Sequence, residues 1–81
     1  MIEVNVNIKF ENEETLSEWA YYYCKDVEND KNIAKNIIDS YWAYSYCKDV
    51  ENDKNIAKNI TNIRWIEKYK EEFGYTPEEE K

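Results

Sequence analysis

The sequence contains no histidine, and its 81 residues include only one glycine, one proline and two cysteines. Without histidine the commonest general base is missing, and two thiols alone do not supply the ligands of a structural zinc site. No phosphate-binding loop and no nucleophile beside a base can be identified in the chain. One glycine and one proline leave few turn signals, which argues against an all-β fold. We therefore expect a protein that is not an enzyme and has no catalytic, cofactor-binding or metal-binding residues.

No run approaches the roughly 20 apolar residues that cross a bilayer, and no charged-then-apolar leader opens the chain. We therefore expect a cytoplasmic protein that does not enter a membrane. Cys24 and Cys47 occupy the same place in an internal duplication. We interpret them as buried, reduced thiols, because free cysteine commonly behaves as a small hydrophobic residue. A disulfide between them is the alternative, provided that their Cα atoms lie within about 7 Å.

A surplus of basic residues is also absent. The formal net charge is −7, and it comes from the ends: residues 1–18 carry five acids and one lysine, and residues 65–81 carry six acids and three lysines. Residues 19–64 carry seven charges of each sign. Binding to bare nucleic acid needs a basic footprint, so direct nucleic-acid binding is not expected. A larger partner protein with a basic surface suits this charge better.

An internal duplication dominates what the sequence does contain. The 14 residues Cys24–Ile37 recur unchanged as Cys47–Ile60. The match extends to a period of 23, in which Trp19–Tyr41 lies over Trp42–Arg64 with five positions different. A duplication of this length is typical of one supersecondary unit used twice. Trp65 continues the spacing, so we expect a third unit, shortened to a capping helix.

The first ten residues alternate between apolar and polar side chains. This alternation predicts one half-buried β-strand of about nine residues. A lone strand has unpaired backbone groups, so we expect it to pair with a second copy of the chain, to dock on another protein, or to extend as an arm. The candidate strand-pairing residues are Ile2, Val4, Val6, Ile8 and Phe10.

After this segment, the spacing of the apolar residues is that of α-helices. The sequence from Thr15 to Glu18 has the capping-box form, which predicts that a helix begins at Thr15. Asp30 is a suitable N-cap for a second, shorter helix, so each unit is predicted to be a helix pair of roughly 11 and 8 residues. The apolar stripe of the first helix is expected at Trp19, Tyr23 and Val27, and that of the second at Ile33, Ala34, Ile37 and Ile38.

The predicted fold class is therefore mainly α, within the α+β class. An N-terminal β-strand is followed by two tandem helix-pair repeats and a C-terminal capping helix, all in a single domain. The expected parts are a strand arm and bend (1–14), repeat unit 1 (15–41), repeat unit 2 (42–64), a truncated capping unit (65–74) and an acidic tail (75–81).

Aromatic residues away from the predicted stripe are candidates for binding. Tyr21 and Tyr44 lie about 200° around the helix from Trp19 and Trp42, so we expect them to face outward. Tyrosine is enriched at protein interfaces. With Tyr41 they form a candidate contact face, the alternative being an aromatic surface that only meets solvent.

The acidic ends have two interpretations. They are either solvated faces that keep an aromatic-rich protein soluble, or carboxylates that imitate a row of phosphates in front of a basic partner. The candidate residues for partner binding among them are Glu11, Glu13, Glu14, Glu18, Glu67, Glu71 and Glu72.

The segment Trp19–Val27, repeated as Trp42–Val50, resembles the short helical repeats with a Tyr-Ala-Lys/Arg-Asp-Val motif of uncharacterised phage, viral and bacterial proteins. Those repeats often have a Gly-Arg-Trp-Pro turn where this chain has Glu28–Lys31. The resemblance covers residues 19–64 and implies a helical repeat array in a phage or mobile-element setting. Small size and acidity in that setting resemble small phage anti-defence inhibitors such as anti-CRISPR proteins.

These observations together favour a non-enzymatic inhibitor. We expect it to bind a larger, basic, nucleic-acid-handling protein and to block it sterically and electrostatically. The alternative is a structural helical-repeat module that assembles as a homodimer through its N-terminal strand.

Overall fold

The structure is a computed structural model, and it describes residues 2–3 and 9–77. The helices within these residues form two pairs followed by a single helix. They are α1 (Glu13–Asp26), α2 (Lys31–Ala34), α3 (Ser40–Asp49), α4 (Lys54–Ala57) and α5 (Ile63–Phe73). The second helix of each pair is a single turn of four residues, shorter than the sequence suggested.

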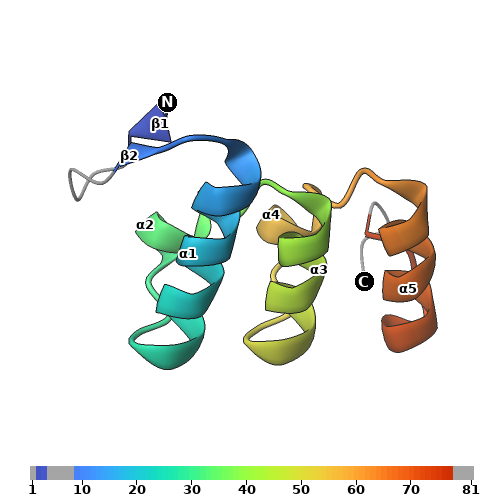
Figure 1. Ribbon diagram of the computed structural model, residues 1–81. Helices are drawn as coiled ribbons and strands as arrows, with labels where there is room; N and C mark the ends of the chain where they lie inside the picture. The colour runs from blue at the N-terminus through green and yellow to red at the C-terminus, as the bar shows by residue number, and fades with distance from the viewer. Residues whose placement is uncertain (1, 4–8, 78–81) are drawn as a thin grey trace.

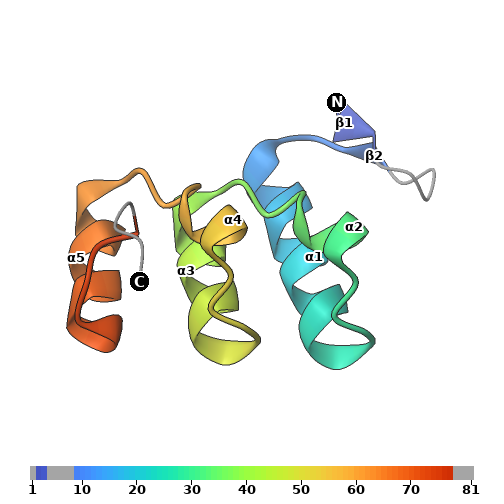
Figure 2. The same cartoon turned by 180° about the vertical axis from the view of Figure 1, so that it is seen from behind.

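The helix pairs stack side by side in two layers. Helices α1, α3 and α5 form one layer, and the short helices α2 and α4 lie behind α1 and α3 (Figures 1 and 2). Each of α1, α3 and α5 runs in the same direction, and a loop after α1 and α3 returns the chain to the second layer. Every unit therefore meets the next one mainly through its long helix.

The predicted N-terminal strand, and with it the predicted fold class, is wrong. In the described part of this segment, only Ile2–Glu3 (β1) and Lys9–Phe10 (β2) have strand geometry, and they pair with each other antiparallel, Ile2 opposite Phe10. These two short strands lie side by side and antiparallel, so their residues do not belong to one continuous nine-residue strand. The other predicted pairing residues, Val4, Val6 and Ile8, lie outside the described residues. A homodimer through this segment stays a prediction, but the single strand on which it was based is not present in the described residues.

Side-chain caps determine where most of the helices begin. Asn12, and not Thr15, caps α1: its side chain accepts a hydrogen bond from the Thr15 amide at 2.8 Å. Asparagine is a stronger N-cap than threonine, and the acidic first turn that follows it suits the positive end of the helix dipole. Asp30 caps α2 as the sequence predicted, and Asp39 caps α3. Gly74 ends α5 with φ of 84°, a conformation that glycine adopts readily.

The core lies between the two layers and between the stacked units. Small side chains allow the long helix of each unit to approach the short one closely, since Ala20, Ala34 and their equivalents are fully buried. Two residues of the predicted apolar stripes, Val27 and Ile38, are exposed instead. Both stand in the connections that leave a helix, where the backbone no longer directs the side chain inward.

A serine near the start of the first helix ties each unit to the connection that leads to the next. Ser17 Oγ accepts hydrogen bonds from the Ile38 and Asp39 amides, both at 2.9 Å. Ser40 Oγ stands 23 residues later and accepts from the two corresponding amides at 3.0 and 3.1 Å. Ser17 is fully buried, whereas Ser40 is partly exposed. The repeat therefore begins before Trp19, and the serine belongs to it.

The loops of successive units are joined by a polar network around a buried tyrosine. The Tyr46 hydroxyl donates to Asn29 Oδ1 at 2.6 Å and accepts from Lys31 Nζ at 3.2 Å. Lys31 also pairs with Glu51 at 2.8 Å and with Asp53 at 2.7 Å. Burial alone would lower the pKa of Lys31, but the bonds to Asp53, Glu51 and Tyr46 outweigh it and raise this pKa. These contacts fix the first unit against the second.

Replacing Lys31 with methionine should lower the free energy of unfolding at neutral pH. It should also make this free energy change less as the pH falls. Hydrogen bonds from Lys31 lower the pKa of Glu51. Burial would raise the pKa of Asp53, but the hydrogen bond and charge of Lys31, together with the bond from the Asn55 amide, lower it. The stability linked to these two carboxylates is therefore present above their usual values of 4.5 and 3.8 and is lost as the pH falls through the lowered values. We expect a loss of roughly 1 kcal/mol at pH 7, since the pair is partly exposed.

Urea unfolding at pH 7 and at pH 3 measures this effect. The free energy of unfolding should fall less between the two pH values in Lys31→Met than in the parent protein. Lys58→Met removes an exposed lysine directly after α4 and serves as the control. An equal acid dependence in all three proteins would contradict the role assigned to Lys31.

The two cysteines are free and buried, as the preferred interpretation of the sequence held, and they do not form the alternative disulfide. Each thiol faces a loop carbonyl of its own unit, Cys24 with Asp30 at 3.7 Å and Cys47 with Asp53 at 3.8 Å. Burial raises the pKa of the Cys47 thiol to about 12. A thiol that stays protonated at neutral pH is a poor nucleophile.

Candidate binding surface

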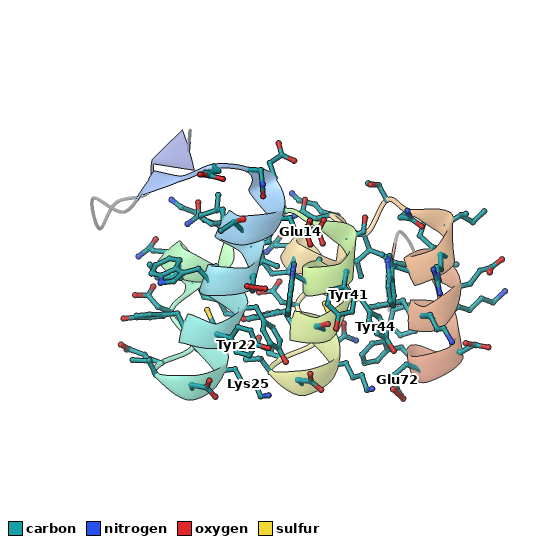
Figure 3. All side chains as sticks on the ribbon, in the orientation of Figure 1. Glu14, Tyr22, Lys25, Tyr41, Tyr44 and Glu72 are labelled. Carbon is teal, nitrogen blue, oxygen red and sulfur yellow. The ribbon has the colours of Figure 1, made fainter. Side chains whose placement is uncertain are left out.

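The structure separates the acidic candidates into two groups. Glu11, Glu13, Glu14 and Glu18 lie at the start of α1, and the others lie on α5. Figure 3 places Glu14 near the upper end of α1 and Glu72 near the lower end of α5, at opposite corners of the molecule. All seven glutamates are exposed. The two groups therefore do not form one continuous row of carboxylates.

Tyr21 does not face outward as expected. Only 4% of its surface is exposed, because its ring lies against Trp42 of the next unit, with the ring centroids 5.2 Å apart. Its hydroxyl donates to Asp49 Oδ2 at 2.7 Å. Burial, followed by this bond to a carboxylate, raises the pKa of Tyr21. Tyr21 therefore holds two units together and offers no contact face.

The first interface, between α1 and α3, is closed by a cluster of aromatic rings. Tyr22 covers Tyr21 edge-on at 5.0 Å and also meets Trp42 at 5.7 Å. Tyr41 meets Trp42 from the other side at 4.7 Å. Tyr22 and Tyr41 keep 46% and 42% of their surface exposed, so the outer edge of this cluster is accessible. Tyr41 was a candidate from the sequence, whereas Tyr22 was not.

The second interface, between α3 and α5, repeats this arrangement with different outer residues. Tyr44 meets Trp65 at 5.6 Å, as Tyr21 meets Trp42. Tyr41 lies 4.9 Å from Trp65 and so contributes to both interfaces. The guanidinium of Arg64 lies over the Trp65 ring at 5.8 Å, a cation–π geometry.

An open hollow of about 220 Å³ lies at the lower part of the second interface, and Tyr44, Lys68, Glu71 and Glu72 line it. Figure 3 shows Tyr44 in the gap between α3 and α5, close to Glu72. Three of these four residues were candidates from the sequence, and they come from two different units. The structure thus brings Tyr44, Glu71 and Glu72 together, while it leaves the N-terminal glutamates and Tyr21 elsewhere.

Sequence reasoning missed the residue that distinguishes the two interfaces. Ser45 stands where the first copy has Tyr22, one of the five differences within the 23-residue period. Another difference places Arg64 where the first copy has Tyr41. Both positions lie in the layer of long helices, beside the rings just described. The signal was available, because Ser45 is one of the few positions at which the two copies differ.

The described residues contain no cluster of three or more side chains suited to hold a metal ion. Among these same residues, no helix has the length and apolar character needed to span a bilayer. The stacked units define a short helical-repeat array with a shortened last unit. Comparison of the chain with protein-family models, curated protein sequences and solved structures found no match.

Proposed function

We propose that this protein is a non-enzymatic binding protein that occupies a basic surface on a larger, nucleic-acid-handling protein and thereby blocks it. The observation that supports the proposal is the convergence of Tyr44, Glu71 and Glu72 on one open hollow. Carboxylates beside an aromatic ring suit lysine and arginine side chains, which pair with the former and stack on the latter. The net charge of −7 attracts such a surface from a distance.

Blockade requires no chemistry from the inhibitor. A basic surface that binds nucleic acid holds phosphates through lysine and arginine, and carboxylates on a rigid stack compete for those same side chains. The stacked units supply the rigidity, since buried rings and hydrogen bonds join each one to the next. An anti-defence role in a phage-infected cell, and hence the host cytosol as compartment, follows from the resemblance of the repeat and from the acidity.

Charge reversal at the C-terminal corner tests the proposal. The variant Glu67→Lys, Glu71→Lys, Glu72→Lys should lose its partner in a pull-down from a lysate of the source or host cell, read by mass spectrometry. The proteins captured by the parent chain should be basic, and raising the salt from 0.1 to about 0.5 M should release them, because exposed charges are then screened.

A second triple variant controls for net charge. Glu11→Lys, Glu13→Lys, Glu18→Lys adds the same six charges at the opposite corner, so both variants go from −7 to −1. Retention of the partner by this variant alone assigns binding to the C-terminal corner. Retention by both variants, or no capture by the parent chain, would refute electrostatic blockade. Loss in both would refute the assignment to this corner.

A further inference from the structure

The two interfaces of the stack share a tyrosine that lies against a tryptophan, yet one is closed and the other is open. In the first, Tyr22 covers Tyr21, and the hydroxyl of Tyr21 is bonded to Asp49 at 2.7 Å. The equivalents of Tyr21 and Asp49, 23 residues later, are Tyr44 and Glu72. The Tyr44 hydroxyl makes no hydrogen bond among the described residues, and its ring is only partly buried. The second interface therefore leaves its tyrosine and its carboxylate available.

One difference between the copies stands next to this opening. Ser45 replaces the ring of Tyr22, so no aromatic side chain from α3 covers Tyr44 in the way that Tyr22 covers Tyr21. The hollow of about 220 Å³ lies beside Tyr44, the residue before Ser45, whereas Ser45 itself is buried and does not line it. The first interface is thus a closed version of the same arrangement, in which Asp49 takes the place of Glu72 and Tyr22 the place of Ser45.

The charges around the hollow favour a cation. Its lining holds two carboxylates, one ammonium and one phenol hydroxyl. The ammonium of Lys68 lies 4.0 Å from Glu71, and both side chains are mostly exposed, so this pair is weak. Glu72 and the Tyr44 hydroxyl can each accept a hydrogen bond from an incoming N–H group.

We propose that this hollow binds an arginine side chain of the partner protein; this rests on the proposed function and names the contact that carries it. A guanidinium is planar and can donate two parallel hydrogen bonds to Glu72 while its face lies against the ring of Tyr44. The same interface already holds one guanidinium on an aromatic ring, that of Arg64 over Trp65. Lysine offers a point charge without the planar face and fits the site less well.

A short blocked peptide, acetyl-Gly-Arg-Gly-amide, serves as the probe. Titration into the ¹⁵N-labelled protein should shift the amide signals of Tyr44, Ser45 and Glu72 and saturate with a Kd on the order of millimolar, as suits a single side chain. The matched lysine peptide should bind at least about threefold more weakly, and the matched glutamate peptide should leave these signals in place.

The chain supplies the variants that test the site. Ser45→Tyr gives the second interface the ring that Tyr22 supplies to the first and should abolish the arginine-dependent shifts. Because Ser45 is buried, the melting temperature of this variant is measured beside that of the parent protein. Tyr22→Ser opens the first interface instead and should leave binding at the second unchanged. Glu72→Gln removes the charge with little change in size and should weaken binding of the arginine peptide roughly tenfold. This variant tests the site even if Ser45→Tyr does not fold.

The outcomes separate this inference from the proposed function. Equal shifts with the lysine or glutamate peptide, or arginine binding that survives both Ser45→Tyr and Glu72→Gln, would overturn the arginine site. If the peptide leaves the hollow unaffected while the C-terminal charge reversal still releases a basic partner, only the arginine site fails. If the peptide binds as expected and the parent chain captures no protein, the proposed function fails instead.

Discussion

Replacing Tyr46 with alanine should cost about 3 to 5 kcal/mol of unfolding free energy, as removal of a fully buried aromatic ring usually does. None of its surface is exposed, and its hydroxyl joins Asn29 and Lys31 of the preceding unit. A domain of 81 residues has a total stability of roughly 4 to 12 kcal/mol. The substitution therefore removes a large part of it and separates the first unit from the second.

The first copy of the repeat provides the control for Tyr46. Tyr23 occupies the same position and is followed by the same 14 residues, but it lies at the open end of the stack and is only partly buried. Tyr23→Ala should cost about 1 kcal/mol, in the range of ordinary substitutions. Urea unfolding followed by circular dichroism measures both variants. Equal losses would show that stacking between units contributes little to stability.

A milder change separates the ring of Tyr46 from its hydroxyl. Tyr46→Phe keeps the packing and should cost about 1 kcal/mol, the usual net value of one hydrogen bond. The difference between the alanine and phenylalanine variants then gives the contribution of the buried ring. If the phenylalanine variant is as unstable as the alanine variant, the whole loss of unfolding free energy comes from the hydrogen bonds of the hydroxyl and none from the ring.

The sequence predicted the units because their signals are local or periodic. The N-caps Asp30 and Asp39 act within one turn, and Tyr46 and Tyr69 repeat at a fixed spacing that places both in the core. The five helices follow in the order that the duplication indicated. Signals of this kind depend little on how the units are arranged in space.

The orientation of Tyr21 could not be predicted in the same way. A single amphipathic helix buries one stripe, and Tyr21 lies on the side away from Trp19. In the stack, α1 is covered by its own short helix α2 and also by α3 of the following unit. This second contact buries Tyr21 against Trp42, whereas Tyr22 lies on the accessible outer side.

The candidate site was predicted in part for a related reason. Glu71 and Glu72 were found because charged residues at a helix end are visible in the sequence. Their proximity to Tyr44 depends on the stacking of α5 on α3, which spacing alone does not give. The importance of Ser45 can be recognised only when the second interface is compared with the first, where Tyr22 occupies the equivalent position and covers Tyr21.

Replacing Ser17 with alanine should cost about 2 to 4 kcal/mol, far more than most substitutions of an exposed serine. Its hydroxyl is the acceptor for the Ile38 and Asp39 amides, and it lies in a fully buried position. Alanine leaves both donors without this partner, and an unsatisfied buried donor costs about 1 to 3 kcal/mol. Hydrogen exchange of these two amides should become faster than that of the helix interiors.

Ser40→Ala is the matched control, because Ser40 makes the same two bonds at 3.0 and 3.1 Å in the second unit. That serine is partly exposed, so water can replace its hydroxyl and the expected cost is only about 1 kcal/mol. Both substitutions place alanine near the start of a long helix, so the gain in helix propensity is similar and largely cancels in the comparison. A Ser17 variant no less stable than the Ser40 variant would mean that the connection between the first two units moves to rehydrate its amides. Burial of Ser17 in the stack would then not increase its contribution to stability.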